Sequence, residues 1–303
     1  GNALGRVIKQ LNRVDGDPGE DVVLTIDAEL QMMVMDRLGN ESASVVVMDV
    51  HTGDVISMVS TPGFDPNSFN LGINHADWKE LLDDPRKPLL NKPLRGQSPP
   101  GSTFKMIVAL AALESGAVTE DFQTFCSGKL KYGNHTFHCW KKHGHGLQDM
   151  VSAIEHSCDV YFYEIARKTG INRIAAMAER FGLGDITGIG VGGERSGLVP
   201  TKEWKLATIG EPWQGGETLN VGIGQGHVLT TPLQLAMMTA QLANGGKRVR
   251  PRLMYSLDAE KETDGKTADK EPAVPEQNQS LGLSEHALSI VLEGMRRGTN
   301  SPT

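Results

Sequence analysis

The feature that most constrains this chain is an apolar helix entered through a rigid turn. A Pro-Pro-Gly turn at residues 99–101 leads into Ser102-Thr-Phe-Lys105, and residues 106–113 are apolar on every side. A helix without a polar face must be buried, and Gly116 marks its end. The sequence therefore predicts a core helix, with Ser102 at its mouth and Lys105 one turn later on the same face.

The spacing of Ser102 and Lys105 is that of a serine nucleophile with an amine base. The positive end of the helix favours negative charge on the hydroxyl, and a partly desolvated amine can be neutral and accept the serine proton. The alternative is a capping serine followed by a surface lysine. A lysine that opens a fully apolar helix needs a local partner, however, so we favour the nucleophile.

A second candidate motif, Ser157-Cys158-Asp159, follows 55 residues after Ser102 and lies between two predicted helices. The hydroxyl of Ser157 could relay a proton to a leaving amine, and the carboxylate of Asp159 could hold Lys105 or a substrate amide. Such a triplet alone would be another helix cap. Together with the first motif, we interpret it as part of a catalytic site.

Composition bounds the class of protein. The 303 residues, 39% of them hydrophobic, can bury a large core and suit one large or two small domains. A net charge of −7 argues against nucleic acid as a partner. No run approaches the ~20 apolar residues of a membrane span, and no signal peptide opens the chain.

Periodicity and turn signals predict the remaining elements. Strands are expected at 21–27, at 44–49 and 54–59 as a hairpin, and at 248–257 as an edge strand. Helices are expected at 28–38, 147–156, 160–169, 171–181, 231–242 and 284–295. Segment 61–98 is expected to be largely irregular, 117–147 to be loop-like and 258–280 to be a mobile loop, whereas 183–228 is glycine-rich. The four tryptophans are expected to be packing residues.

Ordered landmarks resemble those of class B penicillin-binding proteins. They are Leu-Thr-Ile-Asp at 24–27, the stretch 99–105, Ser-Cys-Asp at 157–159 and Gly-Ile-Gly-Gln-Gly at 222–226. The stretches 140–146 and 194–197 resemble the elongation-type subgroup, penicillin-binding protein 2. The resemblance implies an α+β fold, in which an antiparallel sheet is flanked by helices beside an all-helical side. It also implies a tight backbone turn at 222–226 close to the active site.

The activity implied by the resemblance is that of a peptidoglycan D,D-transpeptidase in cell-wall elongation and cell shape. Ser102 would attack the D-Ala-D-Ala carbonyl, assisted by Lys105, Ser157 and Asp159, and β-lactams would acylate the same serine. Backbone N–H groups, including that of Ser102, would hold the oxyanion. The implied partners are peptidoglycan stem peptides, β-lactam antibiotics and other elongation proteins. The implied location is the inner membrane, with the catalytic domain in the periplasm and an N-terminal membrane anchor that is missing here.

One expected motif, a Lys-Thr-Gly strand after the last helix, is not reached before Thr303. We read Lys-Thr-Gly at 168–170 as a helix end, and Lys-Thr-Ala at 266–268 as part of the charged loop. The expected organisation is a linker or remnant at 1–20, followed by a transpeptidase domain at 21–303 that is truncated before its last strands. Two alternatives stay open: a serine β-lactamase or D,D-carboxypeptidase, and a non-catalytic β-lactam sensor or scaffold.

The three cysteines suggest a structural zinc site. Cys126, Cys139 and Cys158 lie within 33 residues, and His145 lies between the last two. Three thiolates and one imidazole match the ligands of a closed tetrahedral zinc site, and the loop at 117–147 has little apolar content to order it otherwise. His138 and His143 are reserve ligands. The alternative is three buried thiols, or one disulfide and a free cysteine.

Overall fold

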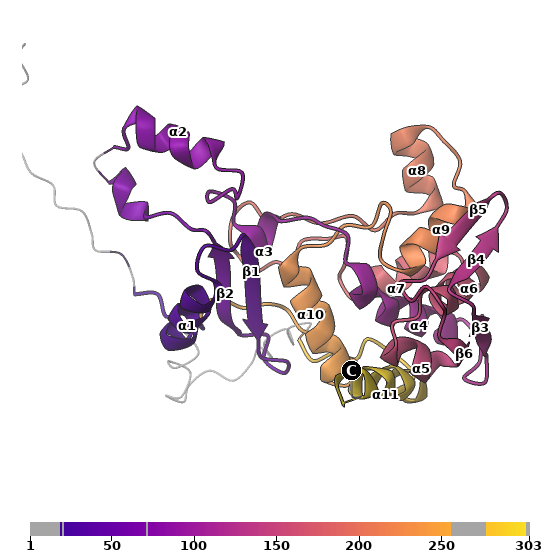
Figure 1. Cartoon of the computed structure of the whole chain (residues 1–303). Helices are drawn as coiled ribbons and strands as arrows, with labels where there is room; N and C mark the ends of the chain where they lie inside the picture. The colour runs from indigo at the N-terminus through magenta and orange to yellow at the C-terminus, as the bar shows by residue number, and fades with distance from the viewer. Residues whose placement is uncertain (1–18, 20, 71, 256–276, 301–303) are drawn as a thin grey trace, which may run out of the picture.

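A body of helices and a small two-stranded sheet form the two sides of the fold (Figure 1). The structure, a computed structural model, describes residues 19, 21–70, 72–255 and 277–300. The helices are α1 (Ala28–Leu38), α2 (His75–Asp83), α3 (Lys92–Arg95), α4 (Lys105–Glu114), α5 (Met150–Glu155), α6 (Asp159–Thr169), α7 (Ile171–Arg180), α8 (Lys202–Ile209), α9 (Gly215–Gly222), α10 (Pro232–Ala243) and α11 (Glu285–Asn300), with 3-10 turns η1 (Pro66–Phe69) and η2 (Gly101–Phe104). The strands are β1 (Ala43–Met48), β2 (Val55–Thr61), β3 (Thr124–Cys126), β4 (Lys129–Tyr132), β5 (His135–His138) and β6 (Gly146–Gln148).

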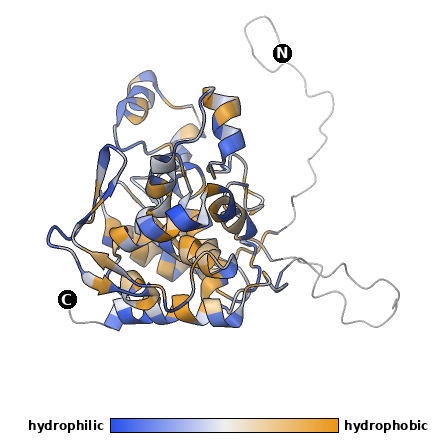
Figure 2. Ribbon diagram, turned by 90° about the vertical axis from the view of Figure 1, so that its right-hand side faces the viewer, coloured by the Kyte–Doolittle hydropathy of each residue, from blue (hydrophilic) through white to orange (hydrophobic). Residues whose placement is uncertain are grey.

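Helix α4 runs through the centre of the helical body, as its apolar sequence predicts. Its residues from Ile107 to Ala112 are all buried, and it packs against α6 and α7. Helix α11 covers α4 and α5, with Val291 fully buried. Figure 2 shows the hydrophobic residues gathered in the middle of this body. The burial of α4 fixes its first turn, which carries the candidate nucleophile.

Strands β1 and β2 form the predicted antiparallel hairpin, with Val45 opposite Val59. Along β2 the residues alternate between buried and half-buried, as expected for a strand with one face on a core. Helix α1 packs on β2 and α10 packs on β1 (Figure 1). A second, smaller core of Val55, Leu94, Ile189 and Leu233 joins this sheet to α3 and α10.

A backbone contact between two glycines positions the entrance to α4. The N–H of Gly101 donates to the carbonyl of Gly224 at 2.9 Å, and both glycines have positive φ angles, +60° and +69°. A side chain on Gly224 would overlap the carbonyl oxygen of Gly101. Ser98 and Thr230 also exchange backbone hydrogen bonds next to this contact. The glycine-rich stretch 222–226 is therefore the tight turn beside Ser102 that the resemblance implied.

Two predicted strands are wrong. In 21–27 and in the described part of 248–257, the structure has only isolated bridges, one of which joins Leu24 to Met254. The first segment must end early because Asp27 caps α1 through the N–H of Leu30. In the second segment, Pro251 lacks the N–H that a continuous ladder requires.

The segments predicted as irregular (61–98) or loop-like (117–147), and the glycine-rich segment 183–228, hold short elements. Segment 61–98 contains η1, α2 and α3, and segment 183–228 contains α8 and α9. Segment 117–147 forms β3 to β5, with the first residues of β6, which pair as β3–β6 and β4–β5. Tyr132 pairs with His135 across a two-residue turn in which Gly133 has a φ of +57°. These elements are short, so local caps and turns define them better than periodicity does.

Most of the other helices agree with prediction to within one residue at each end. The helix predicted from 147 begins only at Met150, because 147–148 belong to β6, and α11 continues five residues past the predicted end at 295. Ser284 lies before the first turn of α11, as predicted. Gly170 ends α6 with a φ of +82°, so Lys-Thr-Gly at 168–170 is the helix end that we predicted. Segment 266–268 and most of the loop predicted at 258–280 lie outside the described residues. Among the described residues, no helix combines the length and the hydrophobicity needed to cross a membrane.

The glycine contact predicts a difference between two alanine variants. Gly224→Ala should lower the free energy of unfolding more than Gly245→Ala, because Gly245 has a similar φ of +86° but open space around it. The control should lose about 1–2 kcal/mol from the left-handed backbone alone. Gly224→Ala should lose a further ~1–3 kcal/mol from steric overlap. Denaturant unfolding measures both values, and equal losses would contradict the role of the contact.

Candidate active site

Ser102 lies in the 3-10 turn η2 immediately before α4, and its side chain is exposed. The carbonyl of Ser102 accepts a hydrogen bond from the N–H of Lys105, which begins α4. Lys105 is only 1% exposed. The sequence therefore places an accessible hydroxyl beside a buried amine, since the same turn brings one residue to the surface and the other into the core.

The buried amine of Lys105 has three acceptors, and all of them come from the second motif. Its Nζ donates to the carbonyl of Ser157 at 2.8 Å, to the Oγ of Ser157 at 2.9 Å and to Oδ1 of Asp159 at 2.7 Å. It also lies 5.4 Å from the centre of the Phe162 ring. An ammonium group has three N–H donors, so these acceptors satisfy it completely. The local partner that the sequence required for Lys105 is therefore Ser157 with Asp159.

Ser157 lies between Lys105 and Ser102. Its Oγ is 2.9 Å from Oγ of Ser102, whereas the hydrogen bonds of Lys105 Nζ go to Ser157 and Asp159. Ser157 has a φ of +50°, a left-handed conformation that is rare for a residue with a side chain. Strained backbone of this kind gathers at functional sites, where the surrounding structure holds it in place. The chain thus contains a continuous path of polar atoms from Ser102 through Ser157 to Lys105.

Asp159 uses both carboxylate oxygens. Oδ1 accepts from Lys105, and Oδ2 accepts from the backbone N–H of Trp140 at 2.9 Å. Trp140 was not among the predicted site residues. It was predicted to be a packing residue, and its ring does pack against His145, but the residue is 63% exposed. Two signals in the sequence could have drawn attention to it: its place directly after Cys139, and its place at the start of the stretch 140–146 that resembles the elongation-type subgroup.

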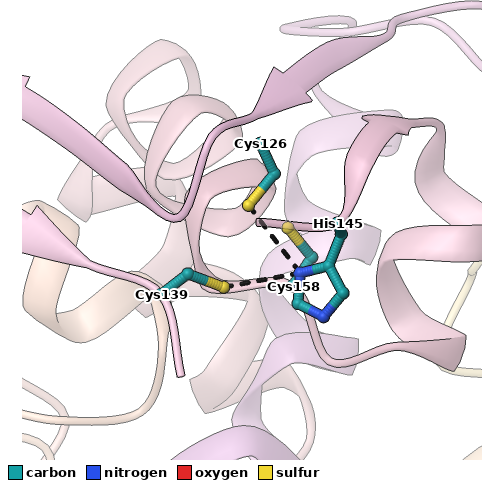
Figure 3. A group of neighbouring side chains, drawn as sticks. All are labelled: Cys126, Cys139, His145 and Cys158. Atoms are coloured by element: carbon teal, nitrogen blue, oxygen red, sulfur yellow. Dashed lines mark hydrogen bonds between the residues drawn. The ribbon is translucent and has the colours of Figure 1, made fainter. Parts of the chain in front are cut away.

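The four predicted metal ligands come together beside this site, with ligand atoms all within 4.8 Å of one another. Nδ1 of His145 points toward the thiols of Cys126 and Cys139, at 3.7 and 3.5 Å (Figure 3). The three cysteines are buried free thiols. The reserve ligands His138 and His143 are exposed and are not members of this cluster.

The environment of the cluster acts on its titratable groups. Burial raises the pKa of the Cys158 thiol, and the neighbouring Cys126 raises it further. Burial, assisted by the charge of Lys141, lowers the pKa of His145. Nε2 of His145 is buried and has no hydrogen-bond partner within the described part of the chain. The lowered pKa of His145 favours the neutral imidazole, which is the form that binds a metal, whereas the raised pKa of Cys158 opposes formation of its thiolate.

Comparison with known proteins identifies relatives of this arrangement. The family model described as the penicillin binding protein transpeptidase domain matches residues 43–303. The peptidoglycan D,D-transpeptidase MrdA of Escherichia coli K12 is 41% identical over 257 residues, which cover 84% of this chain and 41% of that protein. MrdA of Acinetobacter baumannii is 39% identical over 264 residues, covering 86% and 39%. The chain therefore spans about two fifths of the length of these curated relatives.

Solved structures agree with the sequence relatives. The crystal structure of Pseudomonas aeruginosa PBP2 in complex with WCK 5153 has a TM-score of 0.84 and 39% identity, covering 95% of this chain and 64% of that chain. The complex between PBP2 and MreC from Helicobacter pylori has a TM-score of 0.83 and 31% identity, covering 99% and 53%. The fold class predicted from the sequence is confirmed by these similarities.

The buried ion pair predicts an effect on stability. Lys105→Met should lower the free energy of unfolding by about 3–5 kcal/mol, because it leaves the carboxylate of Asp159 without a cation. Asp159→Asn added to Lys105→Met should restore part of that loss, because the uncompensated charge is then gone. Denaturant unfolding of both variants measures the effect. A Lys105→Met protein as stable as the unaltered one would contradict it.

Proposed function

Because this chain belongs to the penicillin-binding protein transpeptidase family, in its penicillin-binding protein 2 branch, we propose that it is the catalytic part of a peptidoglycan D,D-transpeptidase. The observation that supports this most is the path from Ser102 through Ser157 to Lys105, completed by Asp159. It offers an exposed nucleophile, a hydroxyl relay and a buried amine in the order that acyl transfer requires.

The proposed reaction begins with proton transfer from Ser102. When Lys105 is neutral, the two hydroxyls can turn, so that Ser102 donates to Ser157 and Ser157 donates to Lys105. The Oγ of Ser102 then forms a bond to the carbonyl carbon of the penultimate D-Ala. The C–N bond to the terminal D-Ala breaks, and the proton returns along the same path to the departing amine. An amine of a neighbouring stem peptide then attacks the ester and releases Ser102.

A structural zinc ion held by Cys126, Cys139, His145 and Cys158 is part of the proposal. In a tetrahedral site with Zn–S near 2.3 Å and Zn–N near 2.0 Å, nitrogen and sulfur ligands lie about 3.5 Å apart. The distances from Nδ1 of His145 to two thiols, 3.7 and 3.5 Å, fit this spacing. Zinc would supply a cross-link between β3, the 139–145 loop and the Ser-Cys-Asp motif.

The proposed setting is the periplasmic side of the inner membrane, with an N-terminal segment as the anchor. Support comes from the substrate, which is assembled on that side, and from the family. We also propose stem peptides and β-lactams as ligands, and other elongation proteins as partners. The solved complex of Helicobacter pylori PBP2 with MreC supports a partner of that kind.

Covalent labelling tests the proposed nucleophile. Ser102→Ala in the full-length protein should abolish the adduct with a fluorescent penicillin, measured by mass spectrometry. Lys105→Ala should slow acylation by about 10²–10⁴-fold, the usual contribution of a general base. Ser115→Ala, at the other end of α4, is the control and should label normally. An adduct that survives Ser102→Ala would refute the assignment. Rapid turnover of the penicillin would instead indicate a β-lactamase, and failure of the unaltered protein to label would indicate a scaffold.

Elemental analysis tests the zinc site. Protein purified without added metal should contain about one zinc per chain, as expected for a closed site with four protein ligands. Cys139→Ser should lose the zinc and lower the melting temperature, whereas His143→Ala, a nearby exposed histidine, should change neither. Protein without zinc that carries a disulfide between Cys126 and Cys139 would rule the site out.

A further inference from the structure

We propose that Trp140 is a positioning residue for the reaction, whose two N–H groups hold Ser157 and Asp159 in their catalytic geometry. This inference rests on the proposed transpeptidase function. Trp140 follows Cys139 in a segment that packs against the Ser-Cys-Asp motif, and its indole lies edge-to-face with His145, with ring centres 5.2 Å apart. The side chain thus contacts both the cysteine–histidine cluster, through His145, and the backbone of Ser157.

The backbone N–H of Trp140 fixes the carboxylate of Asp159. It donates to Oδ2 at 2.9 Å, and Lys105 donates to Oδ1 at 2.7 Å. With a donor on each oxygen, the carboxylate has one preferred rotation. The backbone position of Trp140 therefore helps to orient the carboxylate of Asp159, and with it the hydrogen bond from Lys105.

The indole N–H of Trp140 holds the strained peptide of Ser157. Nε1 lies 3.1 Å from the carbonyl oxygen of His156 and 3.1 Å from that of Ser157. The Ser157 carbonyl also accepts from Lys105, and the N–H of Ser157 donates to the carbonyl of Ile154 at 3.0 Å, so the indole adds to the hydrogen bonds around a residue with a φ of +50°. Relaxation of that backbone would carry Oγ of Ser157 away from Ser102, to which it is hydrogen-bonded at 2.9 Å.

The exposure of Trp140 indicates that its indole N–H matters more for the position of Ser157 than its ring matters for core packing. With 63% of the residue exposed, the ring buries little apolar surface, although its N–H faces two backbone carbonyls. Loss of the N–H should therefore affect the orientation of Ser157 more than the stability of the fold. Trp213 offers a matched comparison, because its indole N–H donates at 2.8 Å to Thr218, a partner outside the catalytic group.

The test compares Trp140→Phe with Trp213→Phe in the full-length protein. Trp140→Phe should lower the rate constant of the covalent step with a fluorescent penicillin by about 3- to 10-fold, as expected for one hydrogen bond. The dissociation constant of the preceding non-covalent complex and the melting temperature should hardly change. Trp213→Phe should leave the covalent step unaltered. An unchanged covalent step in Trp140→Phe, or an equal loss in Trp213→Phe, would overturn the proposal.

Two further measurements identify the residue through which Trp140 acts. In a Ser157→Ala background, Trp140→Phe should cause no additional loss, because the hydroxyl to be positioned is gone; the same loss in both backgrounds would overturn the proposal. A crystal structure of Trp140→Phe, which needs no adduct, should show Ser157 outside the left-handed region, and an unmoved Ser157 would overturn it. If Ser102→Ala is still labelled by the penicillin, the proposed transpeptidase function fails. If Ser102→Ala is not labelled but Trp140→Phe reacts normally, only the role of Trp140 fails.

Discussion

The site depends on the burial of one amine. Lys105 opens a helix whose other faces are apolar, so its ammonium group cannot reach bulk water and must find acceptors inside the protein. Ser157 and Asp159 supply all three of them from more than 50 residues away. The pairing therefore joins α4 to the start of α6 and brings the second motif to Ser102. The hydrogen bonds that the buried ammonium group of Lys105 requires thus hold Ser157 and Asp159 beside it, next to Ser102.

Much of this arrangement could be predicted from the sequence, because the signals are local and strong. The Ser-x-x-Lys spacing on an apolar helix indicated both the buried amine and the exposed hydroxyl, and the donor types of Cys126, Cys139, His145 and Cys158 indicated a cluster. The long amphipathic or apolar helices were predicted to within a few residues, since their periodicity exceeds several turns. In each of these cases, the residues close by in the sequence are enough to predict the structure.

The missed features depend on contacts between distant segments. Trp140 begins the stretch 140–146 that resembles the elongation-type subgroup, but its hydrogen bonds appear only when the Cys139 segment lies against His156 and Ser157. The strand predicted at 21–27 is absent, because this segment forms only an isolated β-bridge, between Leu24 and Met254. By contrast, β4 and β5 were within reach of sequence reasoning, since a Gly-Asn pair at 133–134 is a hairpin signal. Caps and turns thus deserved more weight than periodicity in the short elements.

The alternation of Ser157, Cys158 and Asp159 has a consequence for how independently two neighbouring sites can vary. The outer two residues face the amine of Lys105 and the middle one faces the cysteine–histidine cluster, so three successive residues serve two neighbouring sites. A backbone shift that moved one of them would disturb both sites at once. A substitution within the Ser-Cys-Asp segment is therefore expected to change the geometry around Lys105 and the cysteine–histidine cluster together, so neither site can be altered there independently of the other.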